Sequence, residues 1–185
     1  ETIKNDKELK VFKIKPENSD VVLIKAWAYL HDVTPKQVFT CIYDTAIRAK
    51  WDTVMHNPHT VEKIDDTYDI FYFCIKAPFA VSNRDFVQKR CVQYDYPEKG
   101  DIIISFQSTT HPKAPPIKGN VRGDTHIAGY IIKPAKNGKD AELHLITQVD
   151  VKGAIPKMVV NFVAGRAPAD WINKLKKACV TYGKQ

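Results

Sequence analysis

Cysteine is scarce in this sequence: the 185 residues contain only Cys41, Cys74, Cys91 and Cys179, which lie far apart without paired spacing. Neither a zinc site nor a disulfide framework is indicated, so we expect buried free thiols in a reducing compartment. No apolar run approaches the length of a membrane span, and the first residues carry no signal-peptide pattern. We therefore expect a cytoplasmic protein, although a chain whose targeting segment had been removed would look the same.

The short motifs of catalysis are also missing. The six histidines show no metal-ligand spacing, and there is no Gly-rich phosphate loop and no nucleophile elbow. Asp65 and Asp66 cannot work as an acid and base pair, because adjacent strand residues point to opposite faces. We expect no enzyme activity, no metal and no cofactor. The net charge of +7 would suit a membrane or a nucleic acid, but scattered basic residues favour neither, and we expect no nucleic-acid binding.

Strand patterns fill most of the chain. A hairpin is predicted from strands at 9–15 and 21–30, followed by a helix behind the capping box 34–37 (TPKQ) and a second short helix over 45–51. Further strands are predicted at 60–64, 68–75, 84–94, 101–110, 121–133 and 143–151. No repeat or linker divides the chain. Residues 1–185 are therefore predicted to be one α+β domain, an antiparallel sheet that closes on a helix.

Alternation along these strands assigns their faces. The strand at 84–91 is unusual, because Arg84 and Arg90 share one face with Phe86 and Gln88, so that either face would bury charge. Arginines that are solvated or salt-bridged at the outer face of the sheet are an equal alternative. In the other strands the predicted inward residues are Phe71, Phe73 and Ile75, then Ile102, Ile104, Phe106 and Ser108, and finally Leu143, Leu145, Thr147, Val149 and Val151.

The C-terminal segment begins with a turn, 152–156 (KGAIP), whose Pro suits the first turn of a helix. Over 157–164 only Lys157 and Asn161 interrupt an apolar surface, whereas 171–182 is an ordinary amphipathic helix. A core helix is the commoner explanation for such an apolar segment. The alternative is a lid over an apolar cavity.

Five short motifs occur in a characteristic order: 50–52 (KWD), 78–87 (PFAVSNRDFV), 111–116 (HPKAPP), 121–122 (VR), and 148–153 (QVDVKG) leading to Ile155 and Pro156. Together they resemble the START family, the lipid-transfer domains related to steroidogenic acute regulatory protein. The resemblance covers residues 9–182 and lacks the family's first helix. It implies the helix-grip fold, in which a curved antiparallel sheet of about nine strands wraps around a long C-terminal helix and encloses a lipid tunnel.

The middle of the chain is most similar to phospholipid carriers of the phosphatidylcholine-transfer type. This similarity implies a monomer that binds one phospholipid, with phosphatidylcholine as the first candidate, and moves it between membranes during transient contact with their surfaces. A lipid-sensing regulatory module and a carrier of sterol or ceramide are the alternatives.

The resemblance also suggests site residues. Family members commonly carry a polar side chain at the position of Phe73, where it meets a sterol or ceramide hydroxyl or pairs with an arginine matching Arg90. Because Phe73 is aromatic, we expect Arg90 to lack a carboxylate and to meet the lipid phosphate, with Arg84 as the second candidate. An aromatic cage for choline could involve Tyr130 or Trp27.

The expected lipid-binding residues are Arg90, Arg84, Phe71, Phe73, Phe106, Ser108, Tyr130, Leu145, Thr147, Val159, Phe162 and Val163. The expected gate and membrane contacts are Pro78, Phe79, Ala80, Val81, Ala154, Ile155 and Pro156. Phe79 would either plug the tunnel mouth or enter the membrane, and both could hold in different states.

Overall fold

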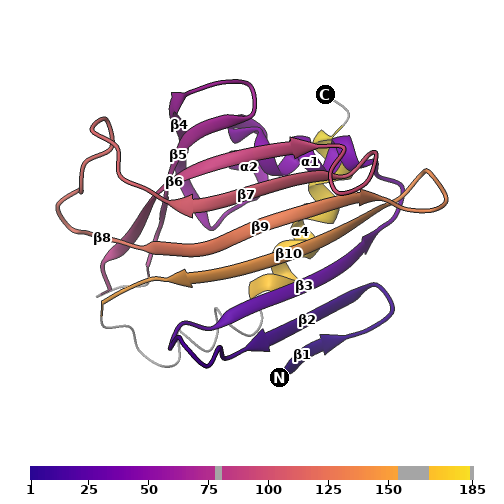
Figure 1. Cartoon of the computed structure of the whole chain (residues 1–185), viewed down its shortest axis with the longest axis horizontal. Coiled ribbons are helices and arrows are strands. Elements are labelled where there is room, and N and C mark those ends of the chain that lie inside the picture. The colour runs from indigo at the N-terminus through magenta and orange to yellow at the C-terminus, as the bar shows by residue number, and fades with distance from the viewer. Residues whose placement is uncertain (78–80, 154–166, 184–185) are drawn as a thin grey trace.

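A computed structural model describes residues 1–77, 81–153 and 167–183. A curved ten-stranded sheet carries helices α1, α2 and α4 on one face (Figure 1). The helices are α1 (Pro35–Tyr43), α2 (Thr45–Trp51) and α4 (Ala167–Tyr182). The strands are β1 (Thr2–Asn5), β2 (Leu9–Ile14), β3 (Leu23–Leu30), β4 (Met55–Lys63), β5 (Tyr68–Ile75), β6 (Asn83–Tyr94), β7 (Ile102–Ser108), β8 (Asn120–Arg122), β9 (Asp124–Pro134) and β10 (Ala141–Asp150).

The main path of the sheet is antiparallel throughout. Its strand order is β1-β2-β3-β10-β9-β7-β6-β5-β4, and the short β8 lies parallel to β6. The predicted strands are present, but β4 begins at Met55 rather than at Thr60. Strand β1 was not predicted, because four residues cannot show a clear alternation, and the single strand predicted over 121–133 is divided into β8 and β9. The predicted α+β fold, a sheet closing on a C-terminal helix, is confirmed, with ten strands in place of about nine.

Local hydrogen bonds explain the two short helices. Thr34 and Gln37 form the predicted capping box at α1: the Thr34 hydroxyl accepts from Gln37 N at 3.3 Å, and the Gln37 side chain accepts from Thr34 N at 2.7 Å. Asp44 caps α2 by accepting from Ala46 N and Ile47 N. These caps satisfy amide groups that a helix start leaves free, so both helices begin where the sequence predicts.

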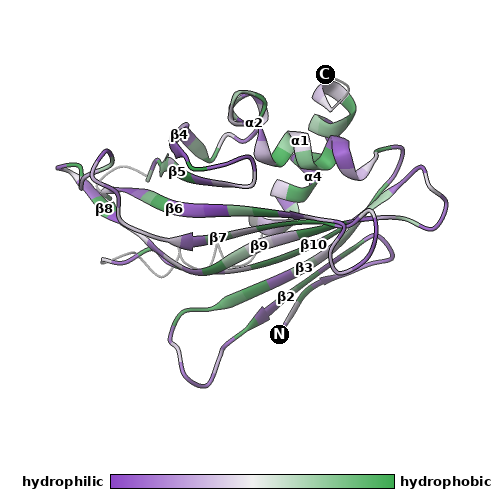
Figure 2. Ribbon diagram, turned by 45° about the horizontal axis from the view of Figure 1, so that its top comes forward, coloured by the Kyte–Doolittle hydropathy of each residue, from purple (hydrophilic) through white to green (hydrophobic). Residues whose placement is uncertain are grey.

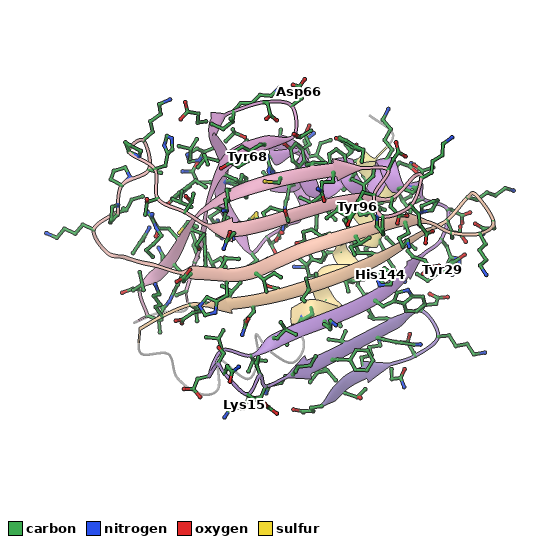
Figure 3. The ribbon with its side chains drawn as sticks, in the orientation of Figure 1. Lys15, Tyr29, Asp66, Tyr68, Tyr96 and His144 are labelled. Atoms are coloured by element: carbon green, nitrogen blue, oxygen red, sulfur yellow. The ribbon has the colours of Figure 1, made fainter. Side chains whose placement is uncertain are left out.

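The main core lies between the inner face of the sheet and the helices, which Figure 2 shows on the same side of the strands. Ile172, Leu175 and Cys179 of α4 are fully buried there. Along β10, Leu143 is buried in this core, whereas its neighbour His144 lies half-buried on the opposite face, together with Tyr29 of β3 (Figure 3). The predicted inward face of β10 is thus confirmed for Leu143. No helix within the described ranges is long and apolar enough to cross a membrane.

Candidate functional site

Strands β5 and β6 form an aromatic wall on the inner face of the sheet. The rings of Phe73 and Phe86 stack with centroids 4.8 Å apart, and Phe71 lies 5.7 Å from Phe73. All three are buried and pack with Val149 and Val151 at the end of β10. The predicted inward facing of Phe71 and Phe73 is therefore confirmed, while their contact with a lipid stays a prediction.

The wall continues across β7, β9 and β10. The Tyr130 ring is perpendicular to Phe106 at 5.8 Å and stacks on Trp171 of α4 at 5.5 Å. Leu145 and Thr147 follow on β10, opposite Tyr130 and Ala128 of β9. The Ser108 hydroxyl accepts from Thr125 N at 2.7 Å. These predicted residues are thus brought together around the inner face of the sheet.

Trp27 does not belong to this wall. It alternates with the buried residues Ala26 and Ala28 of β3, so its ring lies on the outer face, where Nε1 donates to Glu142 and Lys10 covers the ring. The expectation that Trp27 could join a choline cage is therefore wrong. Tyr130 stays a candidate.

Arg90 has the carboxylate that we expected it to lack. Asp69, its cross-strand partner in β5, accepts from Nε at 2.9 Å and from Nη2, while Nη1 donates to the carbonyl of Tyr43 at 2.9 Å. Both members of the pair are buried. The premise that Phe73 leaves Arg90 without a counter-ion is wrong, because the register places Phe73 opposite Phe86 and Asp69 opposite Arg90. The alternative is right that Arg90 is salt-bridged but wrong to place the arginines at the outer face, because Arg84 and Arg90 are both buried.

Arg84 is buried and has no such partner among the residues that the structure describes. Only 5% of it is exposed, and its three hydrogen bonds go to backbone carbonyls, those of Ser82, Val151 and Lys152. Gly153 has φ +71°, and a Cβ there would lie 3.3 Å from Nη2 of Arg84. A side chain at this position would therefore be strained and would crowd the guanidinium.

The same contacts bring together the described residues that flank the two expected gate segments. Asn83 closes the neck of the 77–83 loop, since its side chain accepts from Ala77 N at 3.1 Å. Arg84 then connects Ser82 at this neck to the turn that precedes residue 154. Val81 is half-buried beside the neck. The other expected gate residues and three of the expected lipid contacts lie outside the described residues: Pro78, Phe79, Ala80, Ala154, Ile155, Pro156, Val159, Phe162 and Val163.

A second buried ion pair, which our sequence analysis missed, anchors α4. Arg48 Nε donates to Asp52 Oδ2 at 3.2 Å, and Trp171 Nε1 donates to the same oxygen at 2.9 Å. Burial raises the pKa of the adjacent Tyr130, whose hydroxyl therefore stays neutral. The i,i+4 spacing of Arg48 and Asp52 on a predicted helix could have revealed the pair.

On the outer face, the 111–116 motif folds over β5 and β6. Ala114 is buried against Tyr72 and Val87, and Arg122 holds the loop by bonding Asp85 at 2.9 and 3.1 Å and the carbonyl of Pro115 at 3.2 Å. Burial, followed by the charge of Asp85, raises the pKa of Tyr72 to about 12. These contacts give the 111–116 motif a structural role on the outer face of the sheet.

The comparison with known families agrees with this architecture. The model of the START domain matches residues 1–185. The chain belongs to the START domain family. Mouse START domain-containing protein 10 is 32% identical over 155 residues, which cover 82% of this chain and 50% of that protein. This START chain thus spans about half the length of that relative.

Two further similarities support the assignment. Bovine phosphatidylcholine transfer protein is 25% identical over 177 residues, covering 95% of this START chain and 82% of that protein. The crystal structure of human STARD10 matches with a TM-score of 0.88 and 27% identity, covering 100% of this chain and 74% of that one. The resemblance inferred from the five motifs is therefore confirmed.

Proposed function

We propose that this START domain binds one glycerophospholipid between the inner face of its sheet and its C-terminal segment, and transfers it between membranes. Phosphatidylcholine is the first candidate. Family membership supports the proposal, as do relatives named phosphatidylcholine transfer protein and StAR-related lipid transfer protein 5. We further propose a cytoplasmic monomer without enzymatic activity that touches membranes transiently.

The observation that carries the phospholipid assignment is the buried guanidinium of Arg84. Arg48 and Arg90, the other buried arginines among the described residues, each pair with a carboxylate, but Arg84 bonds only neutral carbonyls. The undescribed segments 78–80 and 154–166 contain no Asp or Glu that could supply one. A buried cation without a counter-ion is costly, and an anionic ligand group would offset that cost.

A phosphodiester meets this requirement better than the headgroups of the alternative lipids. It carries a full negative charge, and its oxygens match the planar fork of arginine. Sterols and ceramide offer only neutral polar groups, which leave the charge uncompensated. Arg84 also shares a face with Phe86, so a phosphate there would lie next to an apolar wall suited to acyl chains. We therefore favour Arg84 over Arg90 as the phosphate ligand.

Native mass spectrometry with lipid extraction tests the proposal. The full chain is incubated with vesicles that contain phosphatidylcholine, cholesterol and ceramide, and is then separated from them. We expect one glycerophospholipid per chain. Protein that retains only sterol or ceramide, or no lipid, would contradict the proposal. Transfer between donor and acceptor vesicles then separates a carrier from a lipid sensor, which would bind without exchanging its ligand.

The role of Arg84 is tested by Arg84→Met, with Lys89→Met as the matched control on the opposite face of β6. Loss of a charge-assisted interaction should weaken phosphatidylcholine binding about tenfold or more in Arg84→Met and leave it unchanged in the control. Arg84→Lys keeps the positive charge but loses the planar guanidinium, so its affinity for phosphatidylcholine should lie between those of Arg84→Met and the control. A folded Arg84→Met protein with normal binding would exclude Arg84 as the phosphate ligand.

A further inference from the structure

Two of the four cysteines face each other between helices. All four are free, as predicted, but only Cys41 of α1 and Cys179 of α4 are fully buried, and both belong to the main core. Figure 1 and Figure 2 both show the C-terminal end of α4 beside α1. Cys74 and Cys91 lie half-buried on the outer face of β5 and β6. The sheet therefore separates the two groups of thiols.

The helices come unusually close at this place. One turn beyond Cys179, a Cβ atom added to Gly183 would lie 2.8 Å from the Cβ of Gln37, which is one turn before Cys41. The backbones are also held in place, because Trp51 Nε1 donates to the Cys41 carbonyl at 2.9 Å and Gly183 N donates to the Cys179 carbonyl at 3.1 Å. One turn away on each helix, the same close packing would bring the Cβ atoms of Cys41 and Cys179 toward the separation of about 3.5–4.5 Å that a disulfide needs.

The two thiols already interact. A hydrogen bond with Cys179 lowers the pKa of Cys41, while the same bond, together with burial, raises the pKa of Cys179. Since the thiolate is the reactive form, Cys41 is the better nucleophile and Cys179 is the resolving thiol.

We propose that Cys41 and Cys179 form a reversible, peroxide-sensitive crosslink that joins α4 to α1. The Cys41 thiolate attacks one oxygen of hydrogen peroxide, the O–O bond breaks, and the sulfenic acid forms as hydroxide leaves and takes up a proton to become water. The Cys179 sulfur then attacks the Cys41 sulfur, and the S–OH group leaves as a second water with the Cys179 proton. Two thiols are oxidised and one peroxide is reduced to two waters. A dithiol reductant reverses the link.

The crosslink affects both the unfolded and the folded state of the protein. It closes the chain between Cys41 and Cys179, which includes most of the sheet, and so restricts the unfolded state. In the folded state it fastens the C-terminal half of α4 to α1. We expect a rise in melting temperature of roughly 5–10 °C and slower amide exchange in the α4 backbone.

Peptide mapping of the full, folded chain tests the proposal. Reduced protein is treated with hydrogen peroxide, free thiols are alkylated, and a non-reducing digest is analysed by mass spectrometry. The expected product is a 41–179 linked peptide about 2 Da lighter than the sum of its thiol forms, lost on reduction. Cys74 and Cys91 cannot pair with each other, because they lie about 20 Å apart along β6 at about 3.3 Å per residue.

Variants separate the crosslink from general oxidation. Cys179→Ala should abolish both the linked peptide and the rise in melting temperature, whereas the double variant Cys74→Ala and Cys91→Ala should keep both. Mapping of the unaltered chain remains decisive if Cys179→Ala does not fold. Recovery of Cys41 and Cys179 as separate alkylated or overoxidised peptides, or unreacted after prolonged peroxide treatment, would overturn the proposal.

Discussion

Asp69 and Arg90 lie opposite each other in the β5–β6 ladder, with both carboxylate oxygens bonded by the guanidinium. The guanidinium carbon also lies 3.8 Å from the ring centre of Tyr43 and 4.6 Å from that of Phe71. The Arg90 guanidinium is therefore surrounded by partners within the fold, which gives the pair a structural role. Arg84 differs, because its hydrogen bonds go to backbone carbonyls.

This closed pair predicts that Arg90→Leu destabilises the protein. The variant leaves Asp69 buried without its counter-ion, with only the Thr60 hydroxyl still donating to it, and this should cost about 3–5 kcal/mol of unfolding free energy. Denaturant unfolding measures the loss. Adding Asp69→Leu removes the orphaned charge and should restore most of the stability. A single variant as stable as the parent would show that Asp69 finds another partner.

The Arg48–Asp52 pair predicts a graded series at the start of α4. Asp52→Leu strands the buried Arg48 and should cost about 3–5 kcal/mol, because a charge is left unpaired. Trp171→Phe removes one hydrogen bond to a carboxylate that keeps its arginine, and should cost only about 1–2 kcal/mol. Denaturant unfolding of both variants checks the order. Equal losses would mean that ring packing, rather than charge pairing, dominates here.

A histidine connects three segments and makes stability pH-dependent. His31 Nε2 bonds Glu8 at 2.9 Å, and Nδ1 lies 3.4 Å from Asp140. The Glu8 hydrogen bond, assisted by the charges of Glu8 and Asp140, raises the pKa of His31 above its ordinary 6.5. The pKa of Glu8 is lowered by His31 and that of Asp140 falls to about 2, mainly through the amide of Asp32, so both stay ionised near neutrality.

The folded state holds the His31 proton more tightly than the unfolded state does. The stabilisation that protonated His31 gives to the folded state is therefore complete below about pH 6.5 and is lost as pH rises through the raised pKa. We expect the melting temperature to fall slightly between pH 6 and pH 8, and His31→Gln to remove that part of the fall. The effect should be small, because the pair is exposed and screened. His126→Gln, on an exposed part of β9, is the control. An identical pH profile in both variants would assign the effect elsewhere.

The expected gate predicts the behaviour of Phe79→Glu. A charge that must enter the membrane interface forfeits a few kcal/mol, so vesicle-to-vesicle transfer should slow by about tenfold while melting and pre-bound lipid stay unchanged. Tyr96→Glu is the control, since this exposed aromatic follows the other end of β6 (Figure 3). Unaltered transfer would exclude the gate. Loss of lipid from the resting protein would instead identify Phe79 as a plug.

Local chemistry made several parts of this protein predictable from sequence. Thr34 and Gln37 cap α1 as expected, because both hydrogen bonds join residues three apart. The inward facing of Phe71 and Phe73 follows from the two-residue period of a strand, which holds whatever the neighbouring strand is. The family could be inferred for a related reason. Its motifs are contiguous stretches of sequence, so they and their order can be recognised without knowing which residues they contact in the fold.

The partners of the charged groups were decided only by tertiary structure. Sequence alone placed Phe73 against Arg90, whereas the ladder register sets Asp69 there, and no local pattern specifies that register. The contact of Cys41 with Cys179 likewise depends on how α4 docks on α1. Register and docking follow from burying the whole inner face at once, so a residue's distant partners are set by the packing of every strand between them.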